Sequence, residues 1–394
     1  MDQDIHLIKR PFLLMAGGPL FNIEKRVGLI KQNAPLTVRR AVLAALLTWV
    51  PLLILSAIER RVFGHNVPVP FLRDFSTYSR FLFAVPLLLA AENILGPRIA
   101  EAAAHFVTSG VVIEKDFQQF DKTVELGLRS RDSVLAEIII AILAYIVSVV
   151  SFWATAVHAT TWYATRENNG ASLTWAGWWL IGFCAPLFNF LVLRWLWRLF
   201  LWFQFLARVR RLDIQLFPTH PDQAGGLGFV GMTQRFFGIL LFSHSLAVTG
   251  VLANEIVYDR LTLQHFIPAI AAYVIVAVGI MVGPLVLFMG TLLKTKRLGL
   301  YQYGTLATTY TGAFHKKWIQ HANSEHEPVL GTGDIQSLAD LGNSYTFVER
   351  MNALPIGPIT LIHLVIASLL PMTLLLLTVM PLKDILKLLF KVLL

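Results

Sequence analysis

Arginines inside a long apolar stretch have the most unusual chemical setting in this sequence. Arg194 and Arg198 stand four residues apart in FNFLVLRWLWRLFLWFQFLARVRRLD, so a helix would place both guanidinium groups on one face. Arg208 and Arg211 follow at the polar end of this stretch, and Asn189 lies near its start. Because charged side chains beside apolar runs rarely face lipid tails, one hypothesis is that these residues line an anion-favouring path through an oligomer. The alternative is that the arginines reach lipid headgroups while neighbouring tryptophans form an aromatic belt.

A turn rich in proline and glycine, LFPTHPDQAGGLGFVG, is the second candidate. His220 and Asp222 are separated by one residue, so both could act on one ligand or hydrogen-bond to each other. Gly225, Gly226 and Gly228 permit a positive φ or a close approach of backbone. We interpret the turn as a gate hinge, an ion-binding turn or a proton-handling pair. The alternative is a structural turn in which Asp222 caps the next helix.

Ionisable residues within the apolar stretches form a third set, because such groups are costly in a membrane and are functional candidates by default. Glu92 and Glu137 lie near the ends of their stretches, where they can meet water. His244 and His363 lie deeper, and buried, hydrogen-bonded structural roles are the alternative for both. A further group of histidines and glutamates at 315–327 matches no zinc-binding spacing, so no metal and no other cofactor is predicted.

Apolar runs of membrane-spanning length must hold these residues. Of the 394 residues, 56% are hydrophobic and 14% are charged, whereas soluble domains carry about 25% charged residues. Because a spanning helix needs about 20 apolar residues, the sequence predicts an all-α, polytopic membrane protein with about seven transmembrane helices and helical extensions. The first two runs are short, so a tilted or re-entrant hairpin there is an alternative. The expected spans are 41–58, 81–96, 134–158, 174–207, 236–257, 266–293 and 359–380.

The basic residues indicate the orientation of the chain. Most of the 33 Lys and Arg residues fall in alternate connecting segments, which predicts a cytoplasmic N-terminus. Contacts of these residues with anionic lipid account for the net charge of +9, so nucleic-acid binding is not expected. The predicted organisation is an N-terminal segment 1–40, a six-span region 41–293 with a helical segment 97–133, a cytoplasmic helical segment 294–358, and a seventh span with an amphipathic tail, 359–394.

The segment 294–358 is expected to contain two helices. The first runs from Leu298 to about His321, and a break at Gly331–Gly333 follows it. The second begins at Asp334, which we expect to be its N-cap because aspartate is among the preferred residues at that position.

Two segments, LDIQLFPTHPDQAGGLGF at 212–229 and DIQSLADLGNS at 334–344, carry a resemblance. The chain resembles an uncharacterised family of bacterial multi-pass inner-membrane proteins, and the His-Pro-Asp-x-x-Gly-Gly-Leu-Gly-Phe signature is its most specific part. The resemblance extends over most of the chain from the third expected span onward. It implies a bacterial inner-membrane location and no known activity, so it assigns no catalytic residues.

Three functional hypotheses follow. The leading one is a homo-oligomeric ion channel or pore-like small-solute transporter with a preference for anions. The second is a membrane scaffold or sensor that docks a cytoplasmic protein partner on its helical extensions. The third is a membrane enzyme that acts on a lipid-linked substrate with His220 and Asp222 as an acid/base pair. Since no nucleophile elbow, phosphate-binding loop or kinase motif is present, a non-enzymatic role is favoured, with membrane lipids and further copies of the chain as expected partners.

Overall fold

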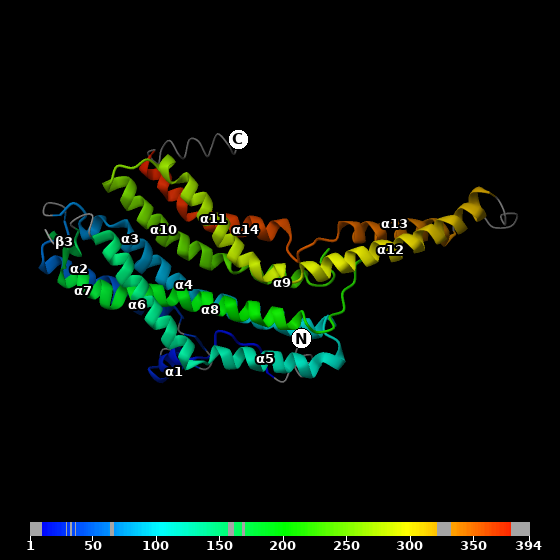
Figure 1. The fold of residues 1–394 in the computed structure, drawn as a ribbon, viewed down its shortest axis with the longest axis horizontal. Coiled ribbons are helices and arrows are strands. Elements are labelled where there is room, and N and C mark those ends of the chain that lie inside the picture. The colour runs from blue at the N-terminus through cyan, green and yellow to red at the C-terminus, as the bar shows by residue number, and fades with distance from the viewer. Residues whose placement is uncertain are drawn as a thin grey trace.

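The structure, a computed structural model, describes residues 10–28, 30–31, 34–35, 37–63, 67–156, 161–167, 170–320 and 332–379. It is an all-α protein, and the described strands form two small antiparallel hairpins (Figure 1). These hairpins are β1 with β2 and β3 with β4. The strands are β1 (Ile30–Lys31), β2 (Ala34–Pro35), β3 (Ala164–Glu167) and β4 (Gly170–Leu173).

The helices of the first half of the chain are α1 (Pro19–Arg26), α2 (Thr37–Ile58), α3 (Phe75–Thr77), α4 (Val85–Thr108), α5 (Phe117–Arg131), α6 (Val134–Ala156), α7 (Trp175–Trp179) and α8 (Ala185–Val209). The later helices are α9 (Gly228–Arg235), α10 (Gly238–Tyr258), α11 (Leu263–Val286), α12 (Met289–Phe314), α13 (Gly333–Arg350) and α14 (Pro358–Leu369). Two π-helical segments, Tyr78–Ala84 and Leu180–Cys184, join α3 to α4 and α7 to α8, so each pair forms one long helix.

Among the described residues, six helices are long and apolar enough to cross a membrane, which confirms the multi-pass helical class. They are Thr37–Ile58, Phe75–Thr108, Val134–Trp153, Trp175–Val209, Gly228–Tyr258 and Leu263–Val286. The expected seventh span is bent by 40° between Pro358–Leu369 and Pro371–Thr378, and counting this broken pair as one span makes seven. Pro371 accounts for the break, because proline removes a backbone hydrogen bond and clashes with the preceding turn.

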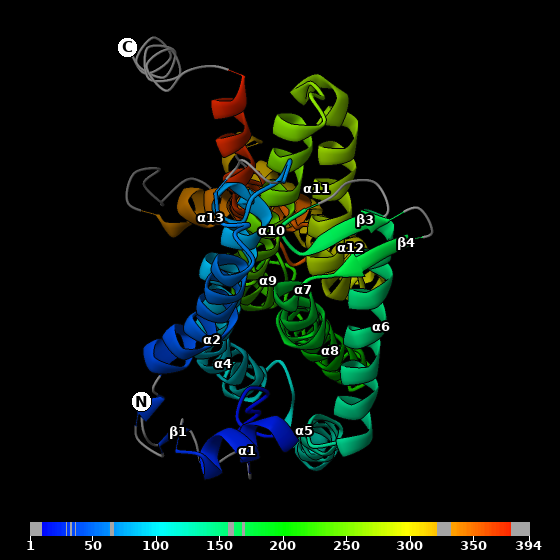
Figure 2. The same ribbon diagram turned by 90° about the vertical axis from the view of Figure 1, so that its left-hand side faces the viewer.

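The long helices form two groups that lie side by side. Figures 1 and 2 show α2, α4, α6 and α8 on one side and α10, α11 and α14 on the other, with α1 and α5 below the first group. The closest helix pairs include α6 with α8, α2 with α4, and α10 with α14. In the most apolar 18-residue stretch of α2, only 17% of the residues are buried inside the protein, and the share is the same in α6. Their exposed Leu, Ile and Val side chains therefore suit contact with lipid.

A buried aspartate holds the end of the bundle that carries β3 and β4. Asp74 is 4% exposed and caps α3 by accepting a hydrogen bond from the Thr77 N–H at 3.2 Å. Its carboxylate also accepts hydrogen bonds from Trp162 Nε1 at 2.8 Å and Asn254 Nδ2 at 2.7 Å. One carboxylate thus links α3 to the segment before β3 and to α10. This cap explains why the second long helix begins at Phe75 rather than at the expected Phe81.

The opposite end carries a long helical hairpin, made of α12 and α13, that projects beyond the bundle (Figure 1). At its base, Pro218 packs against Gly299, where even a Cβ would come within 2.7 Å of the proline ring. The Lys317 Nζ atom pairs with Asp334 Oδ2 at 2.9 Å and closes the hairpin near its far end. Asp334 lies in the first turn of α13, and the N-cap residue is Thr332, so the expected cap at Asp334 is corrected by two residues.

Several sequence-based expectations concern residues outside the described ranges. The amphipathic tail at 380–394, the histidines and glutamates at 321–327 and the first nine residues of the N-terminal segment belong to this part of the chain.

Candidate functional site

A buried group of ion pairs within the membrane-spanning helices is the main candidate site. Glu92 lies at its centre on α4 and is 7% exposed. Glu92 Oε2 accepts a hydrogen bond from Arg40 Nη1 of α2 at 2.9 Å. Glu92 Oε1 accepts hydrogen bonds from two guanidinium groups of α8, Arg198 Nη1 at 2.8 Å and Arg194 Nη1 at 3.2 Å. Three arginines from two helices therefore converge on one carboxylate.

Local sequence explains why these side chains meet. Arg194 and Arg198 are one turn apart on α8, so both face α4, and each is 4% exposed. The Trp195 indole between them donates a hydrogen bond to Leu88 O of α4 at 2.9 Å, and the Arg198 guanidinium carbon lies 5.0 Å from its ring centroid. The tryptophan thus contacts both helices and limits the orientation of Arg198.

Two further carboxylates complete the group, which we call the Glu92 cluster: Glu24, Arg40, Glu92, Glu137, Arg194 and Arg198. Arg40 Nη2 lies 2.8 Å from both carboxylate oxygens of Glu24 on α1, and Arg194 Nε lies 3.7 Å from Glu137 Oε1. Burial raises the pKa of Glu24, and the neighbouring Arg40 opposes this shift. Glu137 Oε2 also accepts a hydrogen bond from Leu20 N–H in the first turn of α1 at 2.8 Å, where a negative charge is favourable.

The charges of the Glu92 cluster balance, because three arginines face three carboxylates. The pairs are not equivalent, however. Arg40 has Glu24 as a second partner and Arg194 has Glu137, whereas among the described residues Arg198 forms an ion pair with Glu92 alone. Among the three arginines, Arg198 is therefore the one whose charge compensation, within the described part of the chain, depends on Glu92 alone.

The other ion-path candidates lie elsewhere on α8. Asn189 Nδ2 donates a hydrogen bond to Ser148 Oγ of α6 at 2.8 Å, on a different face from the Glu92 cluster. Arg208 lies at the end of α8 and Arg211 just beyond it, beside α5, where they line a cavity together with residues of α5. The five residues therefore occupy three separate places in this chain.

The proline- and glycine-rich turn is organised around Asp222. Its carboxylate accepts hydrogen bonds from the N–H groups of Ala224 at 2.8 Å, Gly226 at 3.2 Å and Gly228 at 2.8 Å. Burial would raise the pKa of Asp222, but these hydrogen bonds together outweigh it and lower the pKa. Gly225 and Gly226 have φ values of 66° and 98°, which glycine adopts without steric cost. The N-cap residue of α9 is Leu227, so Asp222 is not the cap itself, but it accepts a hydrogen bond from the N–H of Gly228, the first residue of the helix.

The same turn links the bundle to the helical hairpin. His220 Nδ1 lies 2.7 Å from Asp222 Oδ1, and the His220 side chain is 43% exposed. Gln223 O accepts a hydrogen bond from Asn352 N–H at 2.7 Å, just beyond α13. The hairpin is therefore joined by a backbone hydrogen bond to the turn that contains His220 and Asp222.

The two histidines inside the spans differ in their surroundings. His244 Nδ1 lies 3.1 Å from the Tyr273 hydroxyl of α11, which matches a hydrogen-bonded structural role. His363 is exposed on α14, so its assignment as a buried polar residue is wrong. The buried face of α14 carries Thr360, Leu364 and Ser368, and His363 falls outside this four-residue periodicity.

Sequence reasoning missed three charged residues. Arg40 and Glu24 both fall in the expected N-terminal segment 1–40 and were assigned no role, although both belong to the Glu92 cluster. Arg80 was also missed; its Nε is buried without a hydrogen-bond partner, and its guanidinium carbon lies 6.0 Å from the Phe188 ring centroid. One sequence pattern could have identified these arginines, because an arginine within or next to an apolar run is a candidate buried charge. Four residues fit this pattern: Arg40, Arg80, Arg194 and Arg198.

Within the described residues no group of three or more His, Cys, Asp or Glu side chains could hold a metal ion. Comparisons of the chain with protein-family models, with curated proteins and with solved structures found no match.

Proposed function

We propose that this multi-pass membrane protein is a permeation protein, a channel or pore-like small-solute transporter that prefers anions. The observation that carries the proposal is the convergence of Arg40, Arg194 and Arg198 on Glu92 inside the spanning helices. Burial of several cations in a membrane is expensive and is typical of paths for ions or charged substrates. In this proposal a passing anion takes the place of the Glu92 carboxylate beside Arg198.

Further arginines lie on both sides of the Glu92 cluster, so positively charged groups occur at several levels along these helices. Arg80 lies toward the β3–β4 end, the Glu92 cluster follows, and Arg208 and Arg211 lie at the opposite end of α8. Cationic groups at successive levels favour anions over cations by electrostatic attraction and repulsion. The path would be completed by further copies of the chain, because lipid-facing helices such as α2 and α6 leave apolar faces free for packing in the membrane.

The proposal is tested by ion flux through purified protein in proteoliposomes, with anion and cation gradients applied separately. We expect anion-selective flux in the wild type and loss of selectivity in the double variant Arg194→Ala/Arg198→Ala. The single variant Glu92→Gln removes the competing carboxylate, so among molecules that remain folded it should raise anion flux. Arg129→Ala is the matched control, since Arg129 is 72% exposed and pairs with Glu125 on the surface of α5.

Two results would overturn the proposal. One is the lack of flux of either ion over a range of voltages and pH values with correctly folded wild type. The other is a selectivity that the double arginine variant leaves unchanged, which would reduce the Glu92 cluster to a structural role.

A scaffold or sensor is the second candidate, and the α12–α13 hairpin is the observation that favours it. Its exposed apolar side chains include Tyr301 at 72%, Leu306 at 52% and Ile335 at 51%. Such a surface on a projecting element suits a protein partner. A stoichiometric partner that copurifies with the wild type, but not with a Tyr301→Ser/Ile335→Ser variant, would favour this function over permeation.

We further propose a bacterial inner-membrane location with the N-terminus and the hairpin in the cytoplasm. The resemblance around His220 and Asp222 and the distribution of Lys and Arg residues support this placement. Single cysteines introduced at Ser109 and Thr262 into a Cys184→Ser background would test it by labelling with a membrane-impermeant thiol reagent. Labelling of Ser109→Cys in intact cells would contradict the orientation.

A further inference from the structure

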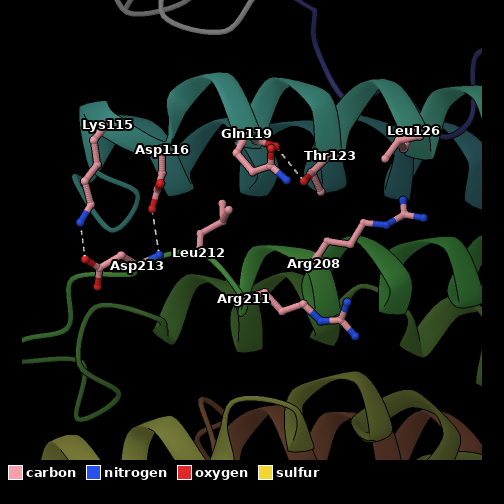
Figure 3. A pocket seen from close by; sticks show the side chains of 9 residues that line it. All are labelled: Lys115, Asp116, Gln119, Thr123, Leu126, Arg208, Arg211, Leu212 and Asp213. Atoms are coloured by element: carbon pink, nitrogen blue, oxygen red, sulfur yellow. Dashed lines mark hydrogen bonds and ion pairs between the residues drawn. The ribbon is translucent and has the colours of Figure 1, made fainter.

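A cavity of about 470 Å³ lies between α5 and the end of α8, away from the Glu92 cluster. Its volume falls in the range of about 300–1,000 Å³ that is usual for small-molecule sites. Figure 3 shows Asp116 at the start of α5, Gln119 of α5 and Arg208 of α8 directed into the space between the two segments, while Arg211 extends along α8. The lining residues are Lys115, Asp116, Gln119, Thr123, Leu126, Arg208, Arg211, Leu212 and Asp213.

The acidic side chains of the cavity are already engaged at one end. Lys115 Nζ pairs with Asp213 Oδ2 at 2.5 Å, and Asp116 Oδ2 accepts a hydrogen bond from the Asp213 N–H at 2.8 Å. The hydrogen bond from Lys115 lowers the availability of Asp213 for other cations and raises the pKa of Lys115. Figure 3 shows these three residues together at one end of the cavity.

The arginines of the cavity have no such partners. Among the described residues neither Arg208 nor Arg211 forms an ion pair, and Arg208 Nη1 is buried without any hydrogen-bond partner. Gln204 Oε1, one turn earlier on α8, is also buried and unpaired. A buried cationic donor without an acceptor is costly, so it calls for a ligand or an ion that supplies one.

The geometry points to a binding site for a phosphate group, and we propose that this cavity takes a phosphate-bearing ligand through Arg208 and Arg211. Guanidinium groups match phosphate oxygens with two parallel hydrogen bonds each, and a phosphate has enough oxygens for two arginines. The Gln119 side-chain amide can contribute a further donor from α5. The cavity exceeds a bare phosphate ion, so the rest of the ligand extends toward the end formed by Lys115 and Asp213.

Two sources of this group share the same chemistry, a soluble phosphate compound and the headgroup of an anionic phospholipid. The experiment separates them with two probes on the full chain in a phosphate-free, zwitterionic detergent buffer. Calorimetric titration with inorganic phosphate reports the soluble source. Native mass spectrometry with phosphatidylglycerol, compared with phosphatidylcholine, reports the lipid source.

The variants follow from the contacts. Arg208→Gln removes the buried guanidinium donor, and no acceptor among the described residues loses its partner. We therefore expect the affinity for the phosphate-bearing probe to fall about tenfold or more, which is the effect of losing one charged hydrogen bond. Arg211→Gln tests the second arginine in the same way. Arg129→Gln, on the exposed side of α5 and paired with Glu125, should keep wild-type affinity.

Binding of inorganic phosphate that weakens in Arg208→Gln but not in Arg129→Gln supports a soluble ligand. Selective binding of phosphatidylglycerol with the same pattern supports a lipid. The proposal is overturned if neither probe binds the wild type above the phosphatidylcholine level, or if Arg208→Gln binds as the wild type does. Because the measurement needs no ion flux, its outcome is independent of the permeation proposal.

Discussion

Replacing Glu92 by Gln removes the carboxylate that Arg40, Arg194 and Arg198 share, and the three arginines respond differently. Arg40 keeps Glu24 at 2.8 Å, and Arg194 keeps Glu137 at 3.7 Å. Arg198 keeps no ion pair among the described residues. The variant therefore leaves one buried guanidinium uncompensated, which we expect to be the main cause of its loss of stability.

The size of the effect follows from these partners. Leaving a buried charge without its partner costs about 3–5 kcal/mol, which is the loss expected for Glu92→Gln. Arg198→Gln leaves Glu92 with two arginines, so its loss should be that of one charged hydrogen bond, about 1.5–3 kcal/mol. The double variant removes both charges and keeps the cluster neutral. It should therefore be more stable than Glu92→Gln alone, with a coupling of about 1–3 kcal/mol.

The assay is reversible unfolding in mixed micelles, followed by circular dichroism of the four proteins of this cycle. The Glu125/Arg129 pair on α5 provides the matched control, because its side chains are 47% and 72% exposed. The same substitutions there should couple by less than about 0.5 kcal/mol. The reasoning is refuted if the Glu92/Arg198 double variant loses as much stability as the sum of its singles.

Two further predictions concern the packing and the turn. Gly250→Ala should destabilise the protein by about 1–3 kcal/mol, because the new Cβ would overlap Ser79 Oγ and lie 2.8 Å from Phe75 O. Gly279→Ala, with no atom within 4 Å of its Cβ, should instead be neutral or stabilising by up to about 1 kcal/mol in the same unfolding assay, and equal losses would contradict the packing. The lowered pKa of Asp222 means that its ionised form stabilises the folded state above about pH 4, and that this contribution disappears as the pH falls through the lowered pKa. The unfolding temperature of the wild type should therefore fall more steeply between about pH 5 and 3 than that of Asp222→Asn, and parallel slopes would contradict this.

The class of the protein and most of its spans were predictable from the sequence, because the length of an apolar run reflects the thickness of the bilayer. The third span illustrates this, since the expected 134–158 compares with the observed helix Val134–Ala156. The start of the second span was not predictable from hydropathy. It depends on Asp74, whose capping role also involves Trp162 and Asn254 from distant parts of the chain.

The Glu92 cluster was visible from the sequence only in parts. Helical periodicity placed Arg194 and Arg198 on one face, but it does not say which helix that face meets. Glu92 is 102 and 106 residues away from them, and only tertiary packing brings them together. The bonds of Asp222 were easier to anticipate, because they are local: each joins residues no more than six positions apart.

The α12–α13 hairpin projects from the bundle as a long arm, and its base contacts the bundle where Pro218 packs against Gly299. If the hairpin rotates, this contact would be the fulcrum of the rotation. The 20 residues beyond Gly299, through Ile319, extend for about 30 Å at the rise of an α-helix. A rotation of about 5° at the fulcrum would therefore move the far end by about 2.6 Å, while the atoms beside Pro218 shift by a small fraction of this distance. A force applied at the far end would therefore act on the turn that Asp222 holds together through an arm as long as the hairpin. The hydrogen bond from Asn352 to Gln223 joins that turn to the other helix of the hairpin.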